Sequence, residues 1–188
     1  MIELRQATAD DATMIAALHT ESWRTAYRAI LSEDFLASGI EADRRRTWTE
    51  RFGAPNPAMR AVIGLLDDQP AGFVCTFLDE DRTWGALVDN LHVLPAAKGR
   101  GLGARLLRSA ADWVAHNRPG RGLHLWVYQV NAPAIAFYDR MGGRAVERAP
   151  QDNPGGDEAP AIRYAWSGSR LERLRGAPGQ DETAKAAR

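Results

Sequence analysis

Three glycines alternate in the segment Lys98-Gly99-Arg100-Gly101-Leu102-Gly103, which follows an apolar run and precedes an apolar-periodic stretch. That order is typical of a strand, a loop and a helix. Glycine permits positive φ and leaves no Cβ in the way of a ligand. Unpaired amides and the helix dipole at such a helix N-terminus favour an anion. The segment therefore predicts a phosphate or pyrophosphate site, with Lys98 and Arg100 adding positive charge.

The common nucleotide motifs do not fit this loop. Gly99-x-Gly101-x-x-Ala104 matches the dinucleotide fingerprint, but the chain has no Asp or Glu between Asp112 and Asp139, where a ribose-binding carboxylate should lie. The next predicted strand offers no arginine for a 2′-phosphate, and no Gly-Lys-Ser/Thr follows to make a P-loop. The prediction is a phosphate cradle of another kind, and a plain glycine-rich turn is the alternative.

The strand before this loop brings a carboxylate toward it. Residues 84–93 predict a long strand, in which alternation puts the odd-numbered residues 87–93 on one face and the even-numbered residues 88–92 on the other. Asp89 thus stands in an otherwise apolar row. Apolar residues at helical spacing predict that the helix after the loop runs from Leu102 to about Asn117.

The remaining patterns alternate between helix and strand. Before the loop they predict strands at residues 2–6, 60–66 and 71–78 and helices at about 8–26 and 33–52. After it they predict a strand at 123–130, a helix from Asn131 to Gly142, and strands at 144–148 and 161–166 around a loop at 150–160. We expect a single domain over residues 1–166 and a polar, disordered tail over residues 167–188.

Composition favours an ordinary soluble domain. Of the 188 residues, 45% are apolar and 26% charged, and the formal net charge of zero gives nucleic-acid binding little support. Cys75 is the lone cysteine, the N-terminal segment lacks signal-peptide zones, and no apolar run approaches a membrane span. We expect a cytoplasmic protein with no membrane and no nucleic-acid partner. The histidines lack ligand spacing, so we expect no metal.

The chain predicts a strand, a glycine loop, a helix and a second strand in this order, followed by Asn131 and by Phe137-Tyr138 before Gly142. This order resembles the GNAT superfamily of acetyl-CoA-dependent N-acetyltransferases. The family pattern Gln/Arg-x-x-Gly-x-Gly/Ala is met by Lys98-x-x-Gly101-x-Gly103, with lysine as the departure, which keeps the charge but loses the fork geometry. The resemblance implies an α+β fold, with a mostly antiparallel sheet of about six to seven strands and about four helices. It also implies that the two central strands, residues 87–93 and 123–128, splay apart.

Acetyl-CoA as acyl donor also follows from the resemblance. It implies that the pyrophosphate lies on the loop amides and that the pantetheine arm runs along β-strand residues 91–93 like an added strand. Asn131 would hydrogen-bond that arm. The implied cofactor-binding residues are Leu91, His92, Val93, Lys98, Gly99, Arg100, Gly101, Leu102, Gly103, Ala104, Asn131 and Tyr138.

Acetyl transfer needs an oxyanion donor, an acid and a neutral amine. The family's oxyanion donor corresponds to a backbone N–H near Val93. Tyr138 matches the tyrosine that protonates the leaving thiolate, and the alternative is that its ring only packs on the sheet. Asp89 is the candidate general base. Its alternatives are a carboxylate held by a neighbouring donor, a role for His92 if a bulge turns it, and a water chain without a dedicated base.

The acceptor is a small-molecule or peptide amine that the sequence does not name. Trp23, Tyr27 and Trp84, together with the loop at 150–160, are the candidates for binding it, although aromatic residues also fill cores. Direct transfer without an acyl-enzyme is expected, because no nucleophile constellation is present. A non-catalytic acetyl-CoA sensor is the alternative function, and Tyr138 argues against it. We expect a monomer or a homodimer.

Overall fold

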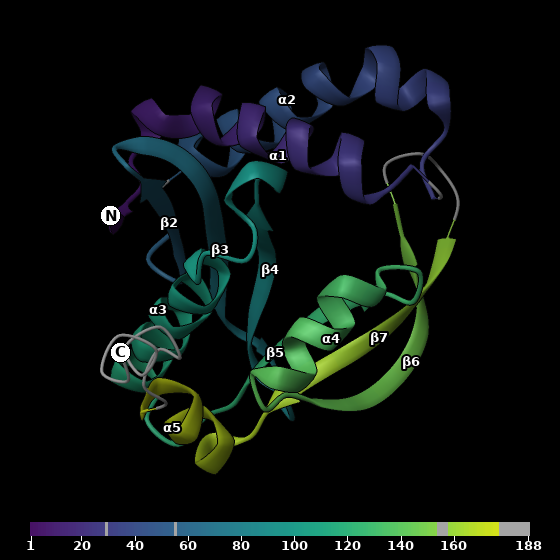
Figure 1. Cartoon of the computed structure of the whole chain (residues 1–188). Coiled ribbons are helices and arrows are strands. Elements are labelled where there is room, and N and C mark those ends of the chain that lie inside the picture. Colours follow the sequence, from purple (N-terminus) through teal and green to yellow (C-terminus); the bar gives the residue numbers. More distant parts are fainter. Residues whose placement is uncertain (29, 55, 154–157, 177–188) are drawn as a thin grey trace, which may run out of the picture.

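The computed structural model describes residues 1–28, 30–54, 56–153 and 158–176. These residues form one sheet in the order β1-β2-β3-β4-β5-β7-β6 (Figure 1). Every neighbouring pair is antiparallel except β4–β5, which is parallel. The predicted α+β class with a mostly antiparallel sheet is confirmed. The strands are β1 (Ile2–Gln6), β2 (Met59–Leu66), β3 (Gln69–Asp81), β4 (Gly85–Val93), β5 (Leu123–Tyr128), β6 (Arg144–Asp152) and β7 (Glu158–Trp166).

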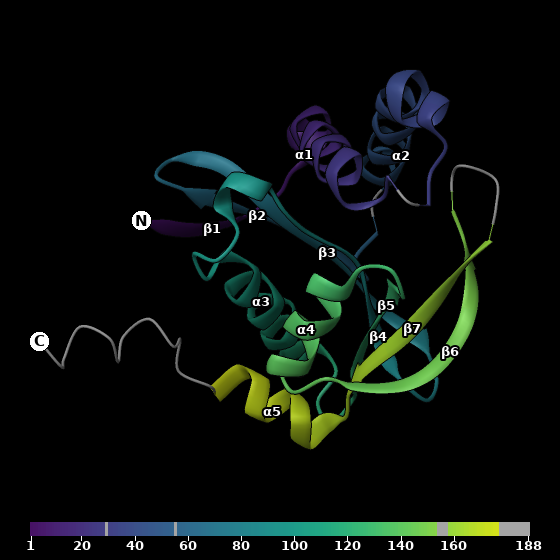
Figure 2. The same cartoon turned by 45° about the vertical axis from the view of Figure 1, so that its right-hand side comes forward.

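Helices cover both faces of this sheet (Figure 2). One face carries α1 (Ala12–Ala26) and α2 (Ile40–Gly53), and the other carries α3 (Leu102–Asn117), α4 (Ala132–Arg140) and α5 (Gly168–Gly176). A π-helical turn, Phe35–Gly39, leads into α2 where the sequence predicts a helix interrupted at Gly39. Among the described helices, none combines the length and apolar character needed to cross a bilayer.

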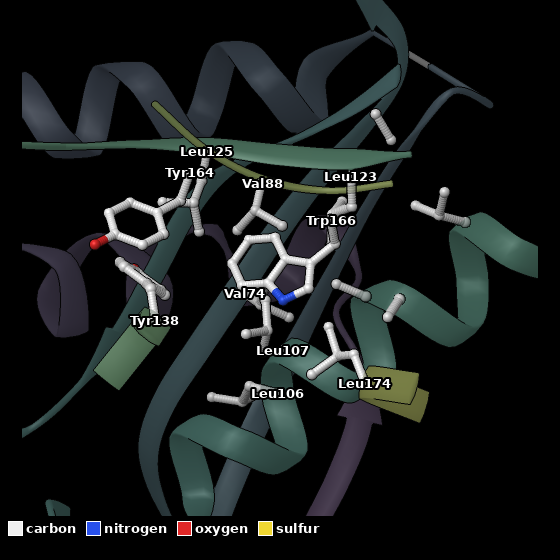
Figure 3. Close-up of a cluster of buried hydrophobic side chains, with 14 of the residues drawn as sticks. Val74, Val88, Leu106, Leu107, Leu123, Leu125, Tyr138, Tyr164, Trp166 and Leu174 are labelled. Carbon is white, nitrogen blue, oxygen red and sulfur yellow. The ribbon is translucent and has the colours of Figure 1, made fainter. Parts of the chain in front are cut away.

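Strand alternation divides the core into two layers. In β3, Phe73 and Cys75 face the layer under α1 and α2, whereas Val74 faces the layer under α3 and α4. Figure 3 shows the second layer, with the indole of Trp166 among aliphatic side chains and Tyr138 beside Tyr164 at its edge. The site-bearing helices are therefore fixed to the sheet by continuous apolar packing.

The parallel pair at the centre of the sheet opens along its length. Only Ala86 with Leu123 and Leu87 with His124 are in register between β4 and β5. Beyond these residues the strands diverge, as predicted, and within the described part of the chain no strand pairs with their facing edges. Unpaired backbone N–H and C=O groups at such a gap need another partner, which an extended ligand can provide.

Two predictions about the C-terminal part need correction. Residues 168–176 of the expected disordered tail form α5, because Leu171 and Leu174 are buried against the core and Arg175 pairs with Asp112 of α3. The polar composition hides this short amphipathic pattern. Much of the predicted loop at 150–160 is strand, since β6 and β7 pair as far as Asp152 with Glu158. Residues 154–157 and 177–188 lie outside the described residues.

Candidate active site

The glycine loop has the geometry of an anion site. Gly99 and Gly101 have φ of 76° and 84°, a left-handed conformation that favours glycine, and Gly101 is the N-cap of α3. The first amide that bonds back into the helix is that of Arg105, to the Gly101 carbonyl at 3.1 Å. Within the described chain, the N–H groups of residues 99–104 donate to no backbone carbonyl. Together with the α3 dipole they can hold a phosphate.

The two cationic side chains of this loop lie at the surface. Arg100 pairs with Asp67 of the β2–β3 turn at 3.0 Å, with both side chains more than half exposed. An ion pair of this kind is weak and yields readily to a better anion. Lys98 is exposed, and its charge acts on His92. Both residues are thus accessible to a phosphate on the loop.

A β-bulge at Asp89 changes which residues share a face of β4. Cys75 of β3 pairs with Asn90 while Thr76 pairs with Val88, so Asp89 is an extra residue. The predicted alternation is therefore wrong before the bulge: Val88 packs in the same layer as Leu91 and Val93. One inserted residue reverses the pleat, and hydrophobic alternation alone does not show the insertion.

Asp89 is partnered in this structure. Its carboxylate lies 2.6 Å from Nη1 of Arg51 on α2, and the same nitrogen donates to Oδ1 of Asn90 at 2.7 Å. The Asp89 side chain is 29% exposed, so water still reaches it. This geometry matches the alternative of a carboxylate held by a neighbouring donor, and it also fixes that carboxylate at the bulge.

His92 lies on the α1 side of β4. Its Nδ1 is 2.9 Å from Oγ of Ser22, and its ring centroid is 4.6 Å from that of His19, with the two rings tilted by 37°. The pKa of His92 is lowered to about 3, mainly by burial and in smaller part by the positive charges of Arg44 and Lys98. The imidazole is therefore neutral at physiological pH, and its backbone, not its ring, lines the gap between β4 and β5.

Tyr138 is buried on α4, on the same face of the sheet as the glycine loop. Burial raises the pKa of its phenol, and Tyr27 raises it further. Its hydroxyl makes no hydrogen bond within the described residues, so it is available to a ligand. Two bonds anchor α4 around it: Tyr164 donates to Asp139 at 2.8 Å, and Trp166 donates to the Met141 carbonyl at 2.9 Å.

Asn131 caps the helix that carries Tyr138. Its Oδ1 accepts from the amide of Ala134 at 3.3 Å, which is a frequent role of asparagine at an N-cap. The Asn131 side chain also interacts with the Tyr27 phenol and opposes the rise in the pKa of Tyr27 that burial causes. One residue thus sets the start of α4 and connects it with Tyr27, which follows α1.

Two of the three aromatic residues expected around the acceptor lie together. The rings of Trp23 and Tyr27 are 5.4 Å apart on α1, and Tyr27 is 5.4 Å from Tyr128 of β5. Burial raises the pKa of Tyr27 to about 12. Trp84 is not brought to this group, because it precedes Gly85 at the far end of β4, about 30 Å of strand from Val93.

Sequence reasoning missed several residues that the fold brings to the site. Ser22 lies on the buried face of α1, where a polar residue in an apolar row was a usable signal. Arg44 and Arg51 are seven residues apart on α2 and flank the buried Trp48, so they share its face. Tyr128 ends β5. None of these belongs to a local motif.

Comparison with known proteins agrees with this geometry. The sequence profile of the acetyltransferase (GNAT) family matches residues 17–143. The chain belongs to this family. GNAT enzymes transfer an acetyl group from acetyl-CoA to an amine, and this GNAT chain is accordingly an acyltransferase with acetyl-CoA as its donor.

Several relatives match most of the length of this GNAT chain at low identity. It is 26% identical to the uncharacterized N-acetyltransferase YuaI of Bacillus subtilis, covering 81% of this chain and 84% of that protein. It is 26% identical to the peptidyl-lysine N-acetyltransferase YjaB of Salmonella typhimurium, covering 82% and 92%. The PaiA N-acetyltransferase of Thermoplasma acidophilum, solved with coenzyme A, shares its fold with a TM-score of 0.67 at 20% identity, over 87% and 98% of the chains.

Proposed function

We propose that this protein transfers the acetyl group directly, without an acyl-enzyme, from bound acetyl-CoA to an amine held on the α1–α2 side of the sheet. The observation that carries the proposal is that the free loop amides and the unbonded Tyr138 hydroxyl occupy the same face of the opened β4–β5 pair. A sensor without catalysis has no use for an unbonded phenol beside the thioester.

The donor would be held mainly by backbone. Amides of residues 99–104 bind the pyrophosphate, with Lys98 and Arg100 adding charge. The pantetheine arm follows Leu91, His92 and Val93 as an extra strand, and the Asn131 NH₂ donates to it. His92 contributes through its backbone, because its ring lies on the α1 side with Ser22.

The chemistry would then proceed from these groups. The neutral amine attacks the thioester carbonyl, and the N–H near Val93 stabilises the oxyanion. Asp89 accepts the proton lost by the attacking nitrogen, either directly or through water. When the C–S bond breaks, the Tyr138 hydroxyl donates its proton to the sulfur, and the products are an amide and free coenzyme A.

The proposal also covers the acceptor site, the location of the enzyme and its partners. Trp23 and Tyr27 would line the acceptor site, and the distant Trp84 would have no part in it. We propose a cytoplasmic enzyme, monomer or homodimer, acting on a small-molecule or peptide amine without a nucleic-acid or membrane partner. Its catalytic domain would comprise residues 1–166, with α5 packed onto it.

A thiol-release assay with acetyl-CoA and a panel of amines tests this function. Tyr138→Phe should lower kcat about 100-fold or more, because it removes the acid, and should leave the KM for acetyl-CoA within about twofold. Tyr164→Phe removes a bond that anchors α4 and leaves the proposed acid in place, so it should lower kcat far less than Tyr138→Phe does. Binding of acetyl-CoA without release on any amine would contradict the enzyme and favour the sensor.

A further inference from the structure

A buried guanidinium lies on the acceptor side of the site. Arg44 of α2 is only 8% exposed, and its Cζ lies 4.4 Å from the ring centroid of Trp23 on α1. Arginine is seldom buried to this extent unless it is paired, so its partners show how far its charge is satisfied. The cation–π contact supplies part of that compensation.

The positive charge of Arg44 affects the pKa values of two residues near the ends of β4 and β5. Arg44 lowers the pKa of His92 near the end of β4, after burial as the main cause. Burial and Asp152 raise the pKa of the Tyr128 phenol at the end of β5, and Arg44 opposes them. Contacts give the same location: Arg44 packs on Trp23, Trp23 contacts Tyr27, and Tyr27 contacts Tyr128 at the end of β5. The guanidinium therefore lies on the α1–α2 face of the sheet, opposite α3 and α4.

The hydrogen bonds of Arg44 leave part of its fork unused. Nε and Nη2 both donate to Oδ2 of Asp43, and Oδ1 of the same carboxylate accepts from Arg46 at 2.7 Å. One carboxylate thus serves two guanidiniums, and the group keeps one net positive charge. The other terminal nitrogen of Arg44 makes no hydrogen bond within the described residues.

Neighbouring polar groups are also donors without acceptors. The indole N–H of Trp23 is buried and has no hydrogen-bond partner in the described part of the chain. Nδ1 of His19 accepts from Trp48 at 3.1 Å, which leaves its buried Nε2 as an unpartnered N–H donor. The aromatic group around Arg44 is therefore rich in donors and poor in acceptors, and this imbalance favours a ligand that accepts hydrogen bonds.

Resting on the proposed acetyltransferase function, we propose that the acceptor is a small amino carboxylic acid whose carboxylate binds Arg44. A carboxylate matches the planar fork of arginine and neutralises the net charge of the group. The rings of Trp23, Tyr27 and Tyr128 provide an apolar wall for the rest of such a molecule. A polyamine is disfavoured at this position, because its additional cation would meet the uncompensated positive charge.

Matched acceptors test the substrate class on the wild-type protein. Leucine, phenylalanine and methionine are each compared with their carboxamide and with the corresponding amine that lacks the carboxyl group, and spermidine is included. The free amino acids should have kcat/KM about 10- to 100-fold above their matched partners, the factor expected for a charged hydrogen-bonded pair. Carboxamides or polyamines that react as well as the free acids would overturn the inference.

Substitutions assign the preference to Arg44. Arg44→Gln should raise the KM for the amino acids about 10- to 100-fold, change it little for the carboxamides, and leave the KM for acetyl-CoA unchanged. Arg44→Lys should recover part of the loss, because it keeps the charge without the fork. Arg45→Gln, at an exposed neighbour, is the control for charge on α2. An unchanged ratio of acids to carboxamides in Arg44→Gln would overturn the assignment.

Failure of this inference differs from failure of the proposed function. Binding of acetyl-CoA is followed by isothermal titration, and folding of each variant by circular dichroism. If acetyl-CoA does not bind the wild type, the acetyltransferase proposal fails and this one with it. If acetyl-CoA binds and amines other than amino acids are acetylated, only the inference fails. If Arg44→Gln does not fold, the wild-type ranking of matched acceptors decides.

Discussion

The carboxylate of Asp89 and the guanidinium of Arg51 are 2.6 Å apart, joining the bulge in β4 to the last turns of α2. Arg51 also lies 5.0 Å from the ring centroid of Trp48 and 5.4 Å from that of Phe77, so its own position is well supported. The pair holds in place the carboxylate that we propose as the general base.

Replacing this carboxylate should slow proton removal. Asp89→Asn keeps the shape and removes the base, so kcat/KM at neutral pH should fall about 100-fold. Steady-state rates between pH 5 and 9 measure this. Asp79→Asn, which breaks an exposed ion pair with Arg118, is the control. A kcat/KM in Asp89→Asn equal to that of the wild type would place the base elsewhere, on His92 or water.

A substitution at Gly103 should change the affinity for acetyl-CoA without lowering the stability of the fold. A Cβ there would lie 3.5 Å from Phe137 and 3.6 Å from Val93, which are ordinary contacts, and its φ is not positive. Gly103→Ala should leave the free energy of unfolding unchanged or raise it by up to about 1 kcal/mol. The added methyl should weaken acetyl-CoA binding about tenfold, because it covers a loop amide.

Gly53→Ala is the matched control, because it likewise adds a methyl group to a helical glycine. At Gly53 that methyl group would have no atom within 4 Å. Its stability should change similarly while acetyl-CoA binding, measured by titration calorimetry, stays as in the wild type. Equal affinity for acetyl-CoA in Gly103→Ala and the wild type would show that the pyrophosphate does not lie on this turn.

Asp11 should make stability depend on acidic pH. The hydrogen bonds from Arg5 lower the pKa of Asp11 to about 2, aided by the Thr8 amide and opposed by burial. Because the folded pKa lies below the ordinary value, the stabilisation is present above about pH 4 and is lost as the pH falls toward 2. Water screens the half-exposed Arg5, so we expect about 1–2 kcal/mol.

Asp11→Asn should therefore lower the free energy of unfolding at pH 7 and have little effect at pH 2, measured by urea denaturation. Asp10→Asn, at the exposed neighbouring position, should change stability little at either pH. A loss in Asp11→Asn that is the same at both pH values would attribute the effect to packing and not to charge.

Leu171 tests whether α5 belongs to the folded domain. It is 1% exposed in the core under α3, and Leu171→Ala should lower the free energy of unfolding by about 2–5 kcal/mol. Val130→Ala, at a 59% exposed position, should cost less than about 0.5 kcal/mol. Thermal or chemical denaturation measures both. Equal stability of the two variants would mean that α5 does not share the cooperative core.

Sequence alone was sufficient wherever a local pattern controls structure. Gly99 and Gly101 adopt positive φ, which glycine favours, and the predicted strand, loop and helix around them are confirmed. The order of this loop and the later helix identified the GNAT family, and from it the α+β class and the opened central strands. These features depend on backbone conformation and periodicity, which neighbouring residues specify.

Tertiary structure alone decided which distant side chains meet. The bulge at Asp89 follows from the register of β3 against β4, and α2 then supplies Arg51 to that carboxylate. The same packing separates Trp84 from Trp23 and buries Arg44 beside Trp23. Such contacts depend on strand register and helix packing, which are set by the summed burial of the whole chain, so no local pattern records them.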